Sequence, residues 1–378
     1  MTGLIRPLLA AVLLSGTGVA REMALAEPDP ARIRTDLEYL CSPDLDGRGT
    51  GTEGSRKAGA YLAAKMQESG LEPLRAGGFG GVTPYHVPWT QPMAGWFFQG
   101  GTHGLKAAWR GGETDWNVAG TIPGADQQLR NEYVFITAHF DHLGRDYETY
   151  WPGADDDASG TAGILEVMRL LRQASPRRTI AILGISGEEE GLLGSEAFLE
   201  DPPLVLDAIK ADINLDMVGR GRVGELHIMP ARREGYVTTL TRDARDAASA
   251  HGITLSAGME DHWQDSDHYS FTRHGIPSVC FNTGLHADYH QPTDTPGKIN
   301  YRGLVNVVRI VRDLALKTAN AEHGPEALPS EVWQSWAWGP YRGPSQAKSA
   351  TIGGTPGIAA GNGDQGSRTG LVRIYGLR

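Results

Sequence analysis

The chain has 378 residues, of which 40% are hydrophobic and 21% are charged, a composition typical of globular rather than disordered proteins. The 45 acidic residues outnumber the 35 basic ones, and the net charge of −10 argues against a nucleic-acid partner. The cysteines, Cys41 and Cys280, are too few for a disulfide-dense scaffold or a Cys-rich zinc module.

Residues 1–26 have the pattern of a secretory signal peptide. Arg6 precedes an apolar run at residues 8–14 that is too short to span a bilayer, and Ala24 and Ala26 have the spacing of a cleavage site. We therefore expect cleavage after Ala26, a secreted or periplasmic protein, and no membrane association after signal removal; an uncleaved N-terminal anchor is the alternative. Export would permit a disulfide between the two cysteines, and two separately buried thiols are the alternative.

Segments of helical periodicity then alternate with short apolar runs typical of buried strands. Helices are expected at residues 30–40, 53–69, 158–173, 192–199, 236–250 and 302–319. Strands are expected at residues 116–122, 133–138, 179–185, 209–217, 226–229 and 276–281. Thr50 and Glu53 fit a capping box at the start of the second helix. The alternation predicts an α/β fold with a single mixed, mostly parallel central sheet and helices on both faces.

The C-terminal residues differ in composition from the rest of the chain. Residues 324–378 are rich in glycine and have little periodicity, so we expect a flexible tail, with a fragment of a lost second domain as the alternative, and assign this segment no function. Deleting this tail should leave residues 27–323 as a folded domain.

Residues with metal-binding chemistry lie near the ends of the predicted strands. They are His139, Asp156, Glu188, Glu189, Asp216 and, in a loop, His290. Ligands of α/β sheets collect outside the carboxyl ends of strands, so several of these side chains should converge. Two histidines and three carboxylates suit zinc, and one bridging carboxylate would give each of two ions three protein ligands. An unligated carboxylate would then transfer the proton, and the Glu188-Glu189 pair offers one residue for each role.

Four motifs in this order resemble the zinc aminopeptidases of metallopeptidase family twenty-eight, which include bacterial secreted leucyl-type aminopeptidases. They are DLDGRGTGTEG at 44–54, GADDDASG at 153–160, EExGLxGS at 188–195 and Ser266-Asp267-His268. The resemblance extends from about residue 37 to 319. It implies that residues 27–323 form a zinc peptidase domain with a zinc-exopeptidase-like fold and two Zn²⁺ ions.

The resemblance also implies a role for each site residue. Asp156 bridges the ions, Glu189 binds one ion and Asp216 binds the other. The histidines His139 and His290 complete the ligand set. Glu188 is the general base, and Asp141 orients the imidazole of His139. The peptide bond between Asp156 and Asp157 is expected to be cis.

Other residues near these motifs have less defined roles. Tyr269 and Tyr289 are candidates for the donor that stabilises the oxyanion. His142 is expected behind the ligands or at the surface. Asp267 and His268 either line the pocket or support the fold.

The resemblance implies a di-zinc aminopeptidase that hydrolyses N-terminal residues from peptides with a free N-terminus, by attack of a metal-bound water with Glu188 as base. Three alternatives stay open: a glutaminyl cyclase-like enzyme with one zinc, a carboxypeptidase-like enzyme, and a binding domain that has lost its metals. Intact ligand and base residues argue against the last. The sequence leaves the preferred side chain and the oligomeric state open.

Overall fold

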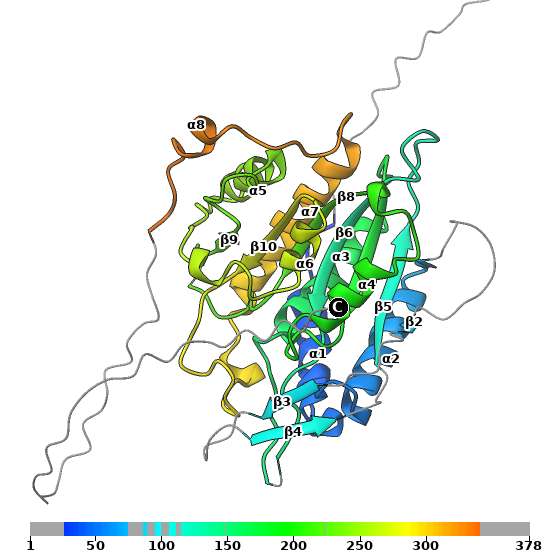
Figure 1. The fold of residues 1–378 in the computed structure, drawn as a ribbon, viewed down its shortest axis with the longest axis vertical. Helices are drawn as coiled ribbons and strands as arrows, with labels where there is room; N and C mark the ends of the chain where they lie inside the picture. The colour runs from blue at the N-terminus through cyan, green and yellow to red at the C-terminus, as the bar shows by residue number, and fades with distance from the viewer. Residues whose placement is uncertain are drawn as a thin grey trace, which may run out of the picture. The chain divides into compact units, whose positions relative to one another are not determined.

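The computed structural model describes residues 26–74, 86–88, 95–99, 106–110, 115–146, 148–222 and 224–340 (Figure 1). At 86–88, 95–99 and 106–110 only the backbone is described. The predicted signal peptide, apart from Ala26, and residues 341–378 of the predicted tail lie outside the described residues. In the part of the chain that is described, every helix is too short or too polar to cross a bilayer.

The described strands form an eight-stranded mixed sheet in the order β1-β5-β7-β6-β8-β10-β9, with β2 also paired to β5 (Figure 1). The central strands run parallel: β6 (Tyr133–His139), β7 (Thr179–Ile185), β8 (Ile209–Leu215) and β10 (Ser278–Asn282). Antiparallel strands flank them: β1 (Glu72–Pro73), β2 (His86–Pro88), β5 (Trp116–Ile122) and β9 (His227–Met229). A separate antiparallel pair consists of β3 (Gly95–Gln99) and β4 (Lys106–Arg110).

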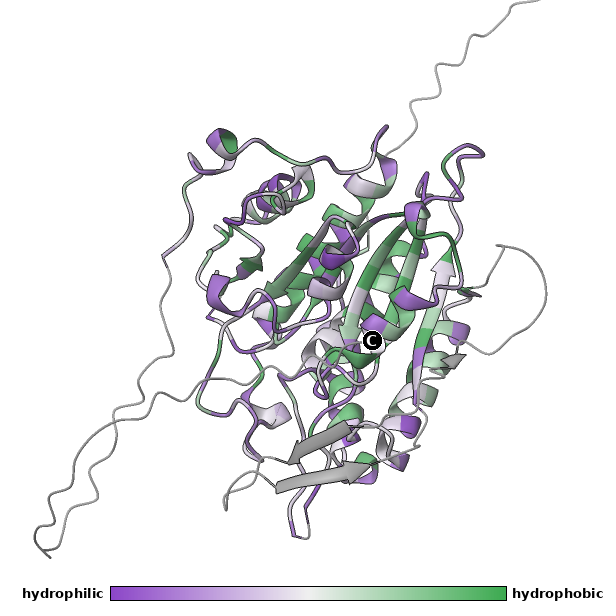
Figure 2. Cartoon of the chain, in the orientation of Figure 1, coloured by the Kyte–Doolittle hydropathy of each residue, from purple (hydrophilic) through white to green (hydrophobic). Residues whose placement is uncertain are grey.

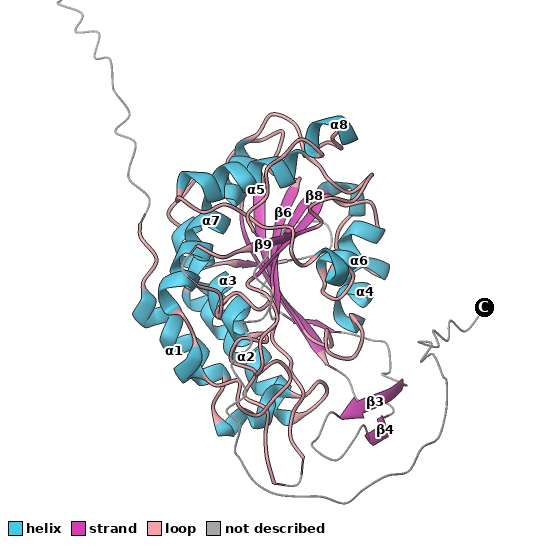
Figure 3. Ribbon diagram, turned by 90° about the vertical axis from the view of Figure 1, so that its left-hand side faces the viewer, coloured by secondary structure: helices cyan, strands magenta, loops and turns pink. Residues whose placement is uncertain are grey.

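Helices cover both faces of the sheet, as the α/β prediction required (Figure 3). One face carries α1 (Pro30–Leu40), α2 (Glu53–Glu68), α3 (Ala158–Leu171), α5 (Thr239–Ala250) and α7 (Tyr301–Asn320). The other face carries α4 (Leu193–Glu200) and α6 (His268–Arg273). Helix α6 was not expected, because six residues are too few for a periodic pattern to be recognised.

The hydrophobic core has one layer on each face of the sheet, which is why the central strands are mostly apolar (Figure 2). Successive side chains of β6 alternate between the layers. Val134 and Ile136 pack into the larger cluster, which contains residues of α1, α2, α3, α5 and α7. Phe135 packs instead against Phe198 of α4 and Phe271 of α6. Burial on both sides fixes the register of the central strands.

Two local predictions are resolved by the structure. The N-cap of α2 is Thr52, whose side chain accepts the N–H of Ser55, so the capping box predicted at Thr50 is wrong. Thr50 instead points into the site described below. Cys41 and Cys280 are both buried and free, which supports the alternative of two separate thiols.

The predicted start of the flexible tail at residue 324 is also wrong. Residues 324–340, the C-terminal strap, pack against the domain and contain the short helix α8 (Ser330–Trp333). The N–H of Leu328 donates to the carbonyl of Val237 at 3.0 Å, and that of Gly339 donates to the carbonyl of Leu255 at 2.8 Å. Trp333 is only 5% exposed. The chain divides into the units Met1–Pro344 and Ser345–Arg378, and the second lies outside the described residues.

Candidate active site

The candidate site lies at the carboxyl ends of the parallel strands. His139 is the last residue of β6, and Asp216 follows β8 directly. The turn after β7 carries Glu188 and Glu189. Because these strands are neighbours in the sheet, their ends meet at one edge, as the sequence predicted.

Asp156 occupies the centre of this site, on the loop before α3. Its Oδ1 lies 3.4 Å from Nε2 of His139, and its Oδ2 lies 3.1 Å from Nε2 of His290. Asp216 Oδ1 lies 3.8 Å from His139 Nε2, and Glu189 Oε2 lies 3.2 Å from His290 Nε2. The five predicted ligands therefore surround two adjacent positions, and the oxygens of Asp156 are divided between them.

The next residue, Asp157, supports this loop. The peptide bond between Asp156 and Asp157 is cis, as expected. Asp157 is the N-cap of α3, and its Oδ1 accepts the N–H groups of Gly160 at 2.9 Å and Met217 at 3.1 Å. It thereby ties the start of α3 to the turn that follows Asp216. Its carboxylate is close enough to His139 and Asp216 to join a ligand set with them, which the sequence did not reveal.

Asp141 connects His139 to the turn that carries Glu188. The backbone oxygen of Asp141 lies 3.3 Å from Nδ1 of His139, and its Oδ1 lies 3.6 Å from the same nitrogen. The carboxylate also accepts the hydroxyl of Thr50 at 2.7 Å and the N–H of Glu188 at 3.2 Å. These contacts restrain both the imidazole ring and the glutamate backbone.

The adjacent glutamates have opposite electrostatic environments. Burial, together with the charges of Asp216 and Glu189, raises the pKa of Glu188 well above its ordinary value. Burial also opposes charge on Glu189, but His142 and His290 lower its pKa to about 2. A pair of carboxyl groups with separated pKa values is typical of sites where one group transfers protons and the other stays charged.

His142 lies next to this site. The sequence left open whether it stands behind the ligands or at the surface. It is 1% exposed, which excludes the surface. Its Nδ1 lies 2.6 Å from Oε1 of Glu189. Since an ionised carboxylate only accepts hydrogen bonds, Nδ1 must carry the proton. His142 also lies close enough to Asp156 and Glu189 for a ligand set.

The donors present fit a pair of zinc ions. All are nitrogen or oxygen atoms, and no described cysteine contributes a thiolate. Asp156 Oδ2 is buried and accepts no hydrogen bond of acceptable geometry from any described residue. Burial lowers the pKa of His290, yet Glu189 and Asp156 raise it to about 10. This concentration of buried negative charge is what bound cations would neutralise.

Comparison with known proteins decides the family. Residues 117–315 match the family model described as "Peptidase family M28". The chain belongs to peptidase family M28. This confirms the resemblance inferred from the motifs.

Several relatives of this chain carry aminopeptidase names. Aminopeptidase YwaD of Bacillus subtilis is 27% identical over 211 residues, which cover 53% of this chain and 44% of that protein. Leucine aminopeptidase 1 of Coccidioides posadasii is 31% identical over 225 residues, covering 54% of this chain and 56% of that protein. The chain thus spans about half the length of these relatives.

Solved structures of low sequence identity share the fold. A zinc aminopeptidase from Bacillus subtilis superposes with a TM-score of 0.59 at 19% identity, covering 78% of this chain and 96% of that chain. A glutaminyl cyclase from Bacteroides thetaiotaomicron, bound to N-acetylhistamine, gives a TM-score of 0.56 at 18% identity, covering 77% and 99%. Both kinds of enzyme therefore use this fold.

The two tyrosines considered as oxyanion donors differ in position. Tyr269 packs on Trp263, and its hydroxyl accepts a hydrogen bond from Gln264 at 3.0 Å. The ring of Tyr289 stacks on His290 with centroids 3.8 Å apart. Although Tyr289 is 37% exposed as a whole residue, partial burial of its hydroxyl and the charge of Asp156, followed by the other site carboxylates, raise its pKa, so the hydroxyl stays protonated.

All three residues of the Ser266-Asp267-His268 motif are buried next to the site. Burial raises the pKa of Asp267 to about 7 and lowers that of His268 to about 3. Ser266 accepts a hydrogen bond from Asn214 Nδ2 at 2.8 Å. Full burial places Asp267 and His268 in the support of the site rather than at its solvent-facing wall.

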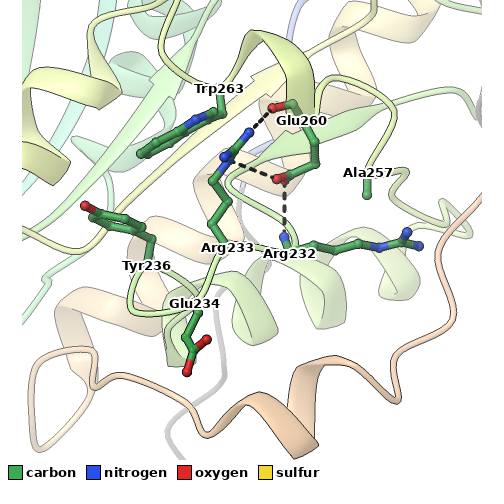
Figure 4. Close-up of a pocket in the computed structure, with 7 residues that line it drawn as sticks. All are labelled: Arg232, Arg233, Glu234, Tyr236, Ala257, Glu260 and Trp263. Carbon is green, nitrogen blue, oxygen red and sulfur yellow. Dashed lines mark hydrogen bonds and ion pairs between the residues drawn. The ribbon is translucent and has the colours of Figure 1, made fainter.

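A cavity of about 540 Å³ lies beside Trp263 (Figure 4). Its lining consists of Arg232, Arg233, Glu234, Tyr236, Ala257, Glu260 and Trp263. Arg233 donates to the backbone oxygen of Glu260 at 2.7 Å, and its guanidinium lies 4.6 Å from the centroid of the Trp263 ring. The cavity includes none of the five predicted ligands, so we assign the chemistry to the carboxylate cluster instead.

Proposed function

We propose that this M28 peptidase is a di-zinc aminopeptidase that removes N-terminal residues from peptides with a free N-terminus. The position of Asp156 supports this most, because one carboxylate oxygen faces His139 and the other faces His290. His139 and Asp216 would hold one ion together with Asp156. Glu189 and His290 would hold the other. Each ion would then have three protein ligands, and its remaining coordination positions would be available to water and substrate.

The bound zinc ions would supply Lewis acidity toward a water molecule and toward the carbonyl of the peptide bond. Glu188 has an oxygen 3.9 Å from His139 Nε2 but belongs to neither ligand set. We assign it as the general base that takes the proton of the attacking water. The same carboxyl group then returns this proton to the amine as the C–N bond breaks.

Two further side chains have roles in this mechanism. Asp141 acts as a positioning residue, because its oxygens near Nδ1 of His139 favour the tautomer whose Nε2 is free to bind metal. Tyr289 presents a protonated hydroxyl, and we assign it as the donor to the oxygen that becomes negative. The enzyme would be secreted or periplasmic, on the evidence of residues 1–26.

A glutaminyl cyclase is the second candidate, because such an enzyme from Bacteroides thetaiotaomicron shares the fold. The complete set of five ligands favours the peptidase, since one zinc ion does not need all of them.

The test is release of the first residue from an unblocked peptide, with the N-acetylated peptide as control. We expect only the unblocked peptide to be cleaved, and zinc analysis to give two ions per chain. Equal cleavage of both peptides would contradict the aminopeptidase. Ammonia release from an N-terminal glutamine, with one ion per chain, would identify the cyclase instead.

Replacement of single ligands tests the bridge. Asp156→Ala should remove both ions, because each site loses a ligand and the two cations are left to repel each other. Asp216→Ala should leave the ion held by Glu189 and His290 largely bound. If each variant retains one tightly bound ion, Asp156 is not the bridge.

A further inference from the structure

His290 is the least supported of the five proposed ligands. Its side chain is 34% exposed, whereas that of Asp156 is 5% exposed and that of Glu189 is 6%. His290 lies in a turn of the loop between β10 and α7, outside the short 3₁₀ helix Pro296–Lys298 of that loop, and its φ is +55°. A ligand in such a loop needs contacts from elsewhere in the fold to hold its position.

The backbone at Arg220, which lies beside this loop, is held in place by several hydrogen bonds. The N–H of Gly219 donates to Asp155 Oδ1 at 2.6 Å, and the carbonyl of Gly219 accepts the N–H of Asn300 at 2.7 Å. The N–H of Arg220 donates to the hydroxyl of Thr283 at 3.2 Å. The turn after β8 is therefore tied to the Asp155 loop, to the end of β10 and to the start of α7.

The guanidinium of Arg220 contacts two aspartates of the His290 loop, one before His290 in the chain and one after it. It donates through Nη2 to Asp288 Oδ2 at 2.5 Å and through Nη1 to Asp294 Oδ1 at 3.1 Å. The Arg220 side chain is 15% exposed and that of Asp294 is fully buried. A planar guanidinium suits such a double contact, because its N–H groups point in fixed directions.

Asp294 extends this connection to the bridging aspartate. Its Oδ2 accepts the N–H groups of Asp155 at 2.8 Å and Asp156 at 3.2 Å. Its carbonyl accepts the N–H of Ala154 at 3.2 Å. Arg220 therefore joins the backbone of Asp156 and the loop of His290 through one carboxylate.

We propose that Arg220 is a positioning residue that sets the distance between His290 and Asp156, and so the affinity of the metal pocket formed by Asp156, Glu189 and His290. This inference rests on the proposed two-ion site. Replacing a residue that hydrogen-bonds to a metal ligand and orients it typically lowers metal affinity ~10–100-fold. We expect a loss of this size for the His290 pocket, with the His139 pocket much less affected.

The test is a zinc titration of the metal-free protein against a competing chelator. Wild type is compared with Arg220→Met and Arg220→Lys, and both variants should lose about 10–100-fold in affinity for one of two ions. The lysine variant keeps the charge but cannot make both contacts at once. Lys298→Met is the matched control: it removes the other cation on Asp288, contacted at 2.5 Å, but leaves the Arg220 contacts intact. Its zinc affinity should match wild type.

A His290→Ala background assigns the affected ion. With His290 replaced, the remaining ion should bind equally with or without Arg220→Met. Wild-type affinity in both Arg220 variants would overturn the inference, as would equal weakening of both ions or a further loss in the His290→Ala background. Arg220→Lys decides the matter if Arg220→Met does not fold. Fewer than two ions in wild type would instead contradict the proposed function.

Discussion

At the scale of single residues, the chemistry depends on two adjacent glutamates whose surroundings differ. Glu189 is tied to His142 at 2.6 Å and to His290 at 3.2 Å, so it faces nitrogen atoms on both sides. The backbone N–H of Glu188 donates to the carboxylate of Asp141 at 3.2 Å. Among the described contacts, the nearest nitrogen to the Glu188 carboxylate is Nε2 of His139 at 3.9 Å. A ligand and a base can thus be neighbours in sequence.

Glutamine at each position should separate these roles. Glu188→Gln preserves size but cannot accept a proton, so both ions should stay bound while kcat falls by ~10²–10⁴-fold. Glu189→Gln should weaken zinc binding, because an amide is a poorer ligand than a carboxylate. Excess zinc should restore part of its activity. Turnover and zinc content are measured together, and rescue of Glu188→Gln by zinc would refute the assignment.

The tyrosines offer a second comparison. Tyr289→Phe removes the hydroxyl beside the carboxylates, and loss of one donor to an oxyanion typically costs ~10²–10³-fold in kcat. Zinc content should not change, because the ring can still stack on His290. Tyr269→Phe is the matched control and should change kcat much less, since its hydroxyl contacts Gln264. Equal loss in both variants would argue against Tyr289.

At the scale of secondary structure, periodic segments were predicted well and irregular ones were not. Strands β6, β7 and β8 lie where apolar runs predicted them, because burial on both faces leaves a strong signal. Three of the five proposed ligands, His139, Glu189 and Asp216, could be placed together from the sequence because they stand at or just after strand ends. The sequence did not predict the contacts of Arg220, Thr50 and His142 with the site. These contacts join segments that are far apart in sequence, so they leave no local pattern.

The C-terminal strap shows the same limit of sequence patterns. Its residues have little periodicity, yet Trp333 is 5% exposed. Arg245 of α5 also lies over the rings of Trp336 at 4.5 Å and Trp338 at 5.0 Å. Individual aromatic residues, rather than a periodic face, attach this segment to the domain.

Truncation at two points should reveal this attachment. A variant that ends at Pro340 should keep the thermal unfolding temperature of the longer chain. A variant that ends at His323 should lose stability, by an amount comparable to the ~3–5 kcal/mol of a buried Trp→Ala replacement. Trp333→Ala in the full chain isolates the side-chain part. Identical unfolding temperatures for the two truncations would mean that the strap does not contribute to stability.

At the scale of the whole molecule, stability should depend on pH through carboxyl groups far from solvent. Asp212 on β8 is fully buried between two strands, where it accepts the hydroxyl of Thr137 at 2.8 Å and that of Ser278. Burial raises its pKa to about 7, although both hydroxyl groups oppose this. Asp126 is different: the N–H of Gln128 and the guanidinium of Arg177 lower its pKa.

These two groups should affect stability with opposite signs. The folded state holds the proton of Asp212 more tightly than the unfolded chain, so the stability it contributes is complete below about pH 4 and is lost as pH rises through about 7. Asp212→Asn cannot ionise. At pH 8 its free energy of unfolding should therefore exceed that of wild type, by at most roughly 4 kcal/mol at about 1.4 kcal/mol per pKa unit. Near pH 4 this advantage should vanish.

Asp126→Asn is the control of opposite sign. The lowered pKa of Asp126 contributes stability above its unfolded pKa and loses it as pH falls through the folded value. This variant should therefore be less stable than wild type at pH 8, and the difference should shrink in acid. Denaturant unfolding at pH 3, pH 4 and pH 8 measures both variants against wild type, because the effect of Asp126 should shrink only below the ordinary aspartate pKa of about 3.9. A difference between Asp212→Asn and wild type that stays constant across this range would mean that Asp212 does not change its ionisation in the folded protein.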